Sequence, residues 1–119
     1  MTPIFPVIEL VDRYSIAKLK FDKTNANYDE LEFYQHQVQQ FDLASVNDEL
    51  ELLYAIHSKI WALESELKTG REQELPLEEI GRRAIAIRDL NNQRVALKNA
   101  IAKSLGCVVR EIKKDHLSQ

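Results

Sequence analysis

The stretch from Leu77 to Leu105 constrains the fold of this chain more than any other part of the sequence. Its apolar residues recur at steps of three and four, the spacing that gathers side chains on one face of a helix. They are Ile80, Ala84, Ile87, Leu90, Val95, Leu97, Ile101, Ala102 and Leu105. The pattern predicts a long helix over 77–105, which begins after Pro76 and ends before Gly106.

The scarcity of turn-forming residues extends this prediction to the whole chain. Only three glycines and three prolines occur among 119 residues, whereas a sheet protein of this length needs many turns built from them. Helices are also predicted over 7–23, 28–41 and 46–68, and an irregular or extended tail over 106–119. We therefore expect an all-α fold, an antiparallel helical hairpin or bundle of three to four helices forming one domain, 1–119.

The predicted helices differ in how much of their surface they bury. Helix 7–23 is apolar on most sides, which is typical of a helix packed between other helices or across an oligomer interface. This pattern favours a homodimer or a higher assembly. Helix 28–41 has only a narrow apolar stripe and is expected on the outside of the bundle. Whether it continues into helix 46–68 is left open by the pattern.

Composition narrows the classes of function. The net charge of −3 argues against a general nucleic-acid binder, which needs a basic stripe. No apolar run approaches the ~18 residues that a membrane-spanning helix requires. The lone Cys107 offers neither a disulfide framework nor a metal cluster. We expect a cytoplasmic protein with no nucleic-acid or membrane partner, and no cofactor or metal is indicated.

Polar residues interrupt the apolar faces of the predicted helices. They are His57 and Glu64 on helix 46–68, Asn91, Arg94 and Lys98 on helix 77–105, and, beside them, Asp12, Ser15 and Lys18 on helix 7–23. The short loop 69–76 makes the last two helices an antiparallel hairpin, and counting back from it places Arg94 and Lys98 near Asp48 and Glu51. Since buried charge is costly unless paired, these residues need partners. For Arg94 we expect Glu51, Glu64 or Asp12 as the partner.

Two interpretations of the polar residues fit the sequence. The favoured one is a structural network that sets helix register and oligomeric state, in a helical interaction or accessory protein. The alternative is a cleft in which Arg94, Lys98 and Asn91 bind a small phosphate or carboxylate compound, with or without catalysis. Candidate ligand-binding residues are then Arg94, Lys98, Asn91, Glu64, His57, Asp12 and Lys18.

Two stretches carry a family resemblance. Residues 9–20 read ELVDRYSIAKLK, and the hairpin combines Trp61 and Glu64 with the pattern L-N-x-x-R-x-x-L-x-x-x-I over 90–101. Together they resemble small bacterial helical proteins of unknown function that tend to be encoded among genes for cell-surface polysaccharides and glycosyltransferases. The resemblance implies a helical fold and makes nucleotide sugars the ligand class to expect. It draws attention to Asp12, Lys18, Trp61, Glu64, Asn91 and Arg94, and region 28–45 adds nothing to it.

A second resemblance is to the helical chorismate mutases. It rests on the long C-terminal helix with one inward arginine, Arg94, among Leu90, Leu97 and Ile101. Those enzymes place such a helix first in the chain, whereas here it comes last. A chorismate-mutase-like reaction is therefore only a remote alternative.

Overall fold

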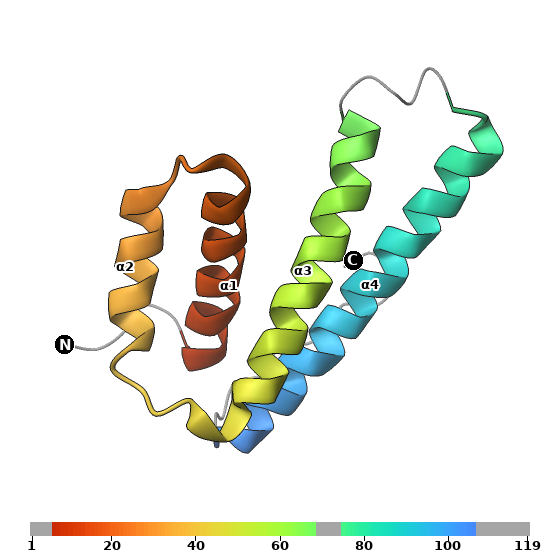
Figure 1. Cartoon of the computed structure of the whole chain (residues 1–119). Coiled ribbons are helices and arrows are strands. Elements are labelled where there is room, and N and C mark those ends of the chain that lie inside the picture. Colours follow the sequence, from red (N-terminus) through yellow and green to blue (C-terminus); the bar gives the residue numbers. More distant parts are fainter. Residues whose placement is uncertain (1–5, 69–74, 107–119) are drawn as a thin grey trace.

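The computed structural model describes residues 6–68 and 75–106, with the backbone alone at 67 and 68. Its elements are α1 (Val7–Thr24), α2 (Tyr28–Val38), a 3₁₀ turn η1 (Ala44–Val46), α3 (Asn47–Lys68) and α4 (Leu77–Ser104) (Figure 1). Within these ranges no strand occurs, and the predicted all-α class is confirmed. Residues 69–74 of the predicted loop, Cys107 and the rest of the predicted tail lie outside the described residues.

The helices agree with their predicted bounds to within one residue, except at the end of α2. That helix ends at Val38, three residues before the predicted end, and a turn and η1 separate it from α3. The Asp42 carboxylate accepts the N–H of Ala44 at 3.1 Å, a local bond that competes with helix continuation. The helices α2 and α3 are therefore separate.

A short connection folds α2 back along α1. Asn25 ends α1 in the left-handed conformation, with φ of 57°, and its N–H donates to the carbonyl of Phe21 at 2.8 Å; asparagine tolerates this conformation better than most residues. Asn27, at the start of α2, uses its side-chain Nδ2 to donate to the carbonyl of Ala17 at 3.1 Å and to Glu30 at 2.9 Å. The Asn27 amide thus joins α2 to α1.

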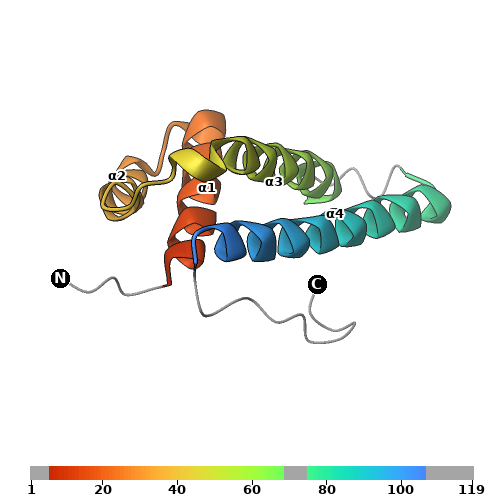
Figure 2. The same ribbon diagram turned by 90° about the horizontal axis from the view of Figure 1, so that it is seen from below.

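The four helices form two antiparallel pairs, α1 with α2 and α3 with α4. Seen from below, α1 lies across both α3 and α4 near the base of their hairpin (Figure 2). The buried core lies at this base and draws on every helix and on η1. Its members are Ile8, Leu10, Val11, Val38, Val46, Leu53, Ile101 and Ala102. Val38 is the one buried residue of α2, which confirms the predicted outer position of that helix.

Most of the apolar surface of α1 is covered by helices of the same chain, with Ile16, 39% exposed, as an exception. Its buried residues are Ile8, Leu10, Val11, Asp12, Ser15, Ala17 and Leu19. Of the two explanations for an all-round apolar helix, packing between helices is therefore the one observed. The pattern of α1 alone no longer requires a second subunit.

The outer half of the α3–α4 hairpin extends beyond α1 and α2 (Figure 1). We call residues 61–66 and 77–90 the outer arm. None of its residues is fully buried, although it contains Leu63, Ile80, Ile87 and Leu90; Ile85 is 52% exposed. Two helices can cover each other only along one seam, so apolar side chains beside that seam stay in contact with water. Among the described helices none is long and apolar enough to cross a membrane.

Because the core lies at the base, we expect Leu53→Ala to be far more harmful than Leu63→Ala. Leu53 is fully buried, and emptying such a site costs about 2–5 kcal/mol. Leu63, on the same helix, is only half-buried and is the matched control. Chemical denaturation of the two variants measures the difference, and similar losses would contradict a core confined to the base.

Candidate functional site

A buried carboxylate, Asp12 on α1, is the centre of the polar residues that the helices bring together. The Asp12 Oδ2 atom lies 3.2 Å from an Arg94 nitrogen and 3.5 Å from Lys98 Nζ, both on α4. Its Oδ1 atom lies 3.0 Å from Nε2 of His57 on α3. One aspartate thus contacts both arms of the long hairpin.

The pKa of Asp12 is held below its ordinary value of 3.8 by these neighbours. Burial by itself raises the pKa, since it disfavours the charged form. The short contact with His57 and the positive charges of Lys98 and Arg94 outweigh burial. Asp12 is therefore ionised in the folded protein at neutral pH.

A second carboxylate completes the charge balance. Lys98 is only 2% exposed, and its Nζ donates to Glu9 at 3.1 Å as well as contacting Asp12. Glu9 lies one turn before Asp12 on α1, and Arg94 lies one turn before Lys98 on α4, so two acids on one helix face two bases on the other. We call Glu9, Asp12, His57, Arg94 and Lys98 the charge network.

Ser15 engages the other ring nitrogen of His57. Its Oγ lies 3.0 Å from Nδ1, and a serine hydroxyl donating to Nδ1 leaves the ring proton on Nε2, facing Asp12. The Nε2–Oδ1 contact is short but not aligned as a hydrogen bond. Asp12 also contacts Arg94 and Lys98, so the arrangement couples α1 to both arms of the hairpin.

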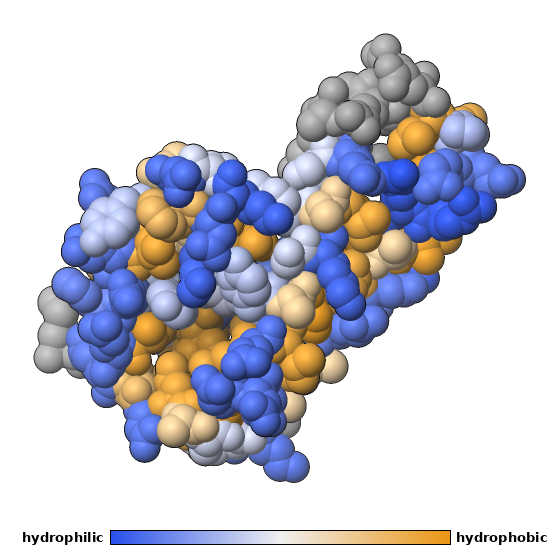
Figure 3. All heavy atoms as spheres, viewed as in Figure 1, coloured by the Kyte–Doolittle hydropathy of each residue, from blue (hydrophilic) through white to orange (hydrophobic). Residues whose placement is uncertain are grey.

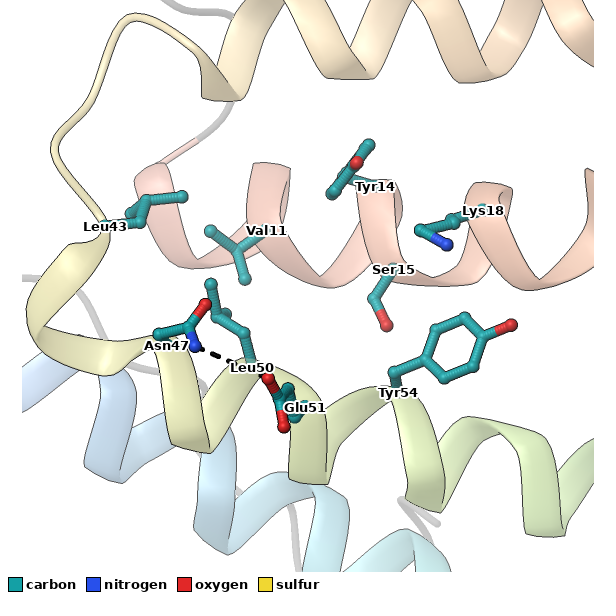
Figure 4. Close-up of a pocket in the computed structure, with 9 residues that line it drawn as sticks. All are labelled: Val11, Tyr14, Ser15, Lys18, Leu43, Asn47, Leu50, Glu51 and Tyr54. Atoms are coloured by element: carbon teal, nitrogen blue, oxygen red, sulfur yellow. Dashed lines mark hydrogen bonds between the residues drawn. The ribbon is translucent and has the colours of Figure 1, made fainter.

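Two hollows flank α1. The larger, about 370 Å³, lies between α1, the connection before α3 and the first turns of α3 (Figure 4). The residues that line it are Val11, Tyr14, Ser15, Lys18, Leu43, Asn47, Leu50, Glu51 and Tyr54. Figure 3 shows a hollow with hydrophobic residues at its bottom, in the half of the molecule that contains α1 and α2.

Four polar side chains of this larger hollow bond to one another or to a residue at its edge. Asn47 donates to Glu51 at 3.4 Å (Figure 4). Lys18 lies 3.4 Å from Asp22, and the Tyr54 hydroxyl donates to the same carboxylate. That hydrogen bond raises the pKa of Tyr54 to about 12 and lowers the pKa of Asp22. Because these side chains already have partners within the chain, few of them are left to bind a polar ligand.

The smaller hollow, about 270 Å³, lies on the other side of His57, between α1, α3 and α4. We call it the Trp61 hollow. Its apolar lining consists of Ile16, Leu19, Ile60 and Trp61, and its polar lining consists of His57, Glu64, Asn91 and Arg94. Arg94 Nε donates to Asn91 Oδ1 at 3.4 Å.

All but one of the predicted site residues lie close together, in the charge network or beside it. Arg94, Lys98, His57 and Asp12 form the charge network, and Asn91 and Glu64 line the Trp61 hollow beside it. Lys18 stands apart in the larger hollow, half exposed and paired with Asp22. Their role in binding stays a prediction.

Of the three acids expected to pair with Arg94, Asp12 is the one that the structure places beside it. Glu51, at the start of α3, is exposed and accepts from Asn47 instead. One partner was missed, the acid on α1 that pairs with Lys98. The missed partner is Glu9, and its place three residues before Asp12 on the same face was the available signal. In the described ranges no three His, Cys, Asp or Glu side chains lie close enough together to hold a metal ion.

Comparison of the chain with protein-family models, curated proteins and solved structures finds no match. The family resemblance drawn from the sequence therefore stays a prediction.

We expect Arg94→Met to destabilise the protein, because it leaves Asp12 buried with one of its two cations removed. Breaking a buried ion pair from one side costs on the order of 3 kcal/mol or more. Arg88→Met, at an exposed position of the same helix, is the matched control and should change stability little. An Arg94→Met denaturation midpoint at or above that of the wild type would show that the network does not stabilise the fold.

We also expect Asp12 to contribute to acid unfolding. A carboxyl group whose pKa is lower in the folded than in the unfolded state stabilises the fold above its unfolded pKa, and this contribution is lost as the pH falls through the folded value. Asp12→Asn should therefore flatten the decline in stability below the ordinary value of 3.8. Asp89→Asn is the control, since Asp89 is exposed on α4 and solvent screens its contact with Arg88. Equal acid profiles for the wild type and Asp12→Asn would refute this role.

Proposed function

We propose that this protein is a helical interaction protein that forms a homodimer through its outer arm. The observation that carries the proposal is that no described residue of the arm is fully buried, although half-buried and exposed isoleucines and leucines line both of its helices. Apolar surface of this kind is typical of helices that pack against a partner.

The charge network supports an interaction protein rather than a simple anion site. Arg94 and Lys98, the two cations expected to attract an anionic ligand, each lie beside a carboxylate of α1. An incoming phosphate would have to compete with Asp12 and Glu9. No contact within residues 6–68 and 75–106 favours a nucleotide sugar or a chorismate-mutase-like reaction.

A second copy of the chain is the partner that suits the arm best. Two helical arms packed side by side form a four-helix bundle, which covers the outer sides of both seams. In a two-fold dimer the same surface of each subunit forms the interface, so the exposed apolar residues of one arm contact the same residues of the other arm. The arm also carries both signs of charge, with Glu78 and Glu79 near one end and Arg88 and Asp89 near the other.

We further propose that the dimer acts in the cytoplasm. The single cysteine of the sequence is typical of proteins from reducing compartments.

Ile85→Glu should convert the dimer to a monomer. Ile85 is 52% exposed at the centre of the outer arm, and a buried unpaired carboxylate at an interface is strongly unfavourable. Light scattering behind a sizing column should report twice the chain mass of 13.8 kDa for the wild type and one chain mass for Ile85→Glu.

Leu52→Glu is the matched control for this experiment. Leu52 is exposed to a similar extent, 57%, but lies on α3 outside the arm, so this variant should stay dimeric. A monomeric wild type at high micromolar concentration would overturn the proposal. A dimer that survives Ile85→Glu but dissociates in Leu52→Glu would place the interface elsewhere.

A further inference from the structure

The Trp61 hollow contains polar groups whose hydrogen-bonding capacity the described chain does not use. Arg94 engages Asn91 through Nε and Asp12 through NH1, which leaves NH2 without a partner among the described residues. Asn91 accepts through Oδ1 and has no described acceptor for Nδ2. Glu64, half-buried on the opposite helix, has neither an ion pair nor a hydrogen bond within those residues. The larger hollow differs, because its polar side chains are paired locally.

The two charged ends of the hollow lean toward each other. Side chains on a helix tilt toward the N-terminus of that helix, and α3 and α4 are antiparallel (Figure 1). Glu64 therefore leans toward the base of the hairpin and Arg94 toward its tip, as the contact from Arg94 back to Asn91 confirms. The two do not form an ion pair with each other, and both line the same hollow.

The charges around the hollow indicate which charged groups a bound molecule would have. Behind the hollow, Glu9 and Asp12 offset Lys98 and Arg94, so the charge without a described partner is the carboxylate of Glu64. A positive group placed there also lies near Trp61, one turn earlier on α3, whose ring face attracts cations. The N–H groups of Arg94 and Asn91 that have no described partner can donate to an acceptor, and a carboxylate suits their geometry.

We propose that the Trp61 hollow binds a free α-amino acid with an apolar side chain. Its ammonium group pairs with Glu64 beside Trp61, and its carboxylate accepts from Arg94 and Asn91. Its side chain packs against the apolar wall of Ile16, Leu19 and Ile60. The volume of about 270 Å³ is at the small end of ligand pockets. Trp61 and Glu64 belong to the outer arm, but Ile85, at the centre of the arm, does not line the hollow, so amino-acid binding can be tested in the Ile85→Glu variant separately from dimerisation.

The chain supplies its own reporter for this proposal. Trp61 is the single tryptophan, so its fluorescence reports on the hollow alone. The probes are leucine and phenylalanine, compared with isoamylamine, which lacks the carboxylate of leucine, and isocaproate, which lacks its amine. Each charge-assisted contact contributes enough for leucine to bind roughly ten- to hundredfold more tightly than either analogue.

Glu64→Gln separates this site from a merely apolar cavity. The variant should lower the affinity for leucine about tenfold while leaving the affinity for isocaproate unchanged, because isocaproate has no amine for Glu64 to bind. Glu51→Gln, on the same helix but in the larger hollow, is the matched control and should bind as the wild type does. Circular dichroism verifies that both variants are folded.

Three results would overturn the proposal. They are no saturable fluorescence change with leucine or phenylalanine, an analogue that binds as tightly as leucine, and a Glu64→Gln variant that binds leucine as the wild type does. The titration is repeated on Ile85→Glu, where binding should persist. Failure of dimerisation and failure of amino-acid binding are thereby distinguished.

Discussion

The ionised carboxylate of Asp12 is the interaction on which the arrangement of the helices depends. It is almost fully buried and contacts His57 on one arm of the hairpin and Arg94 and Lys98 on the other. A buried charge is tolerated only where its partners are held close. Apolar packing alone would permit α1 to slide or rotate on the hairpin, whereas these contacts specify one register and one rotation.

The acids of α1 neutralise the cations of α4, and this affects which ligands the nearby Trp61 hollow can attract. A seam that contains arginine and lysine resembles an anion site when α1 is ignored. Once α1 is docked, Glu9 and Asp12 occupy the faces of those cations. The groups left unused are then Glu64, Asn91 and part of the Arg94 guanidinium, all around the single tryptophan. These groups suit the zwitterion proposed above better than a phosphate.

The position of the core explains why one part of the hairpin remains available to a partner. Buried residues of α4 begin only at Val95, and those of α1 are spread along its length. The base of the hairpin is therefore covered by α1, with α2 outside it, while the outer arm has only its two helices. A helix pair of this kind buries one seam and leaves neighbouring apolar side chains exposed. The fold thus separates a self-contained base from an arm suited to association.

The sequence by itself determined the helical class and nearly every helix boundary, because helical periodicity and the placement of Pro76 and Gly106 are local signals. It also identified His57, Asp12, Asn91, Arg94 and Lys98 as polar residues on apolar faces, since a helix places side chains by simple rotation. The tertiary structure decided which charges pair. Glu9 and Asp12 lie more than eighty residues from Lys98 and Arg94 in sequence, and no local pattern encodes the angle at which α1 crosses α4. That crossing angle depends on many apolar contacts at once, and it determines which charges are neutralised and which remain exposed to a ligand.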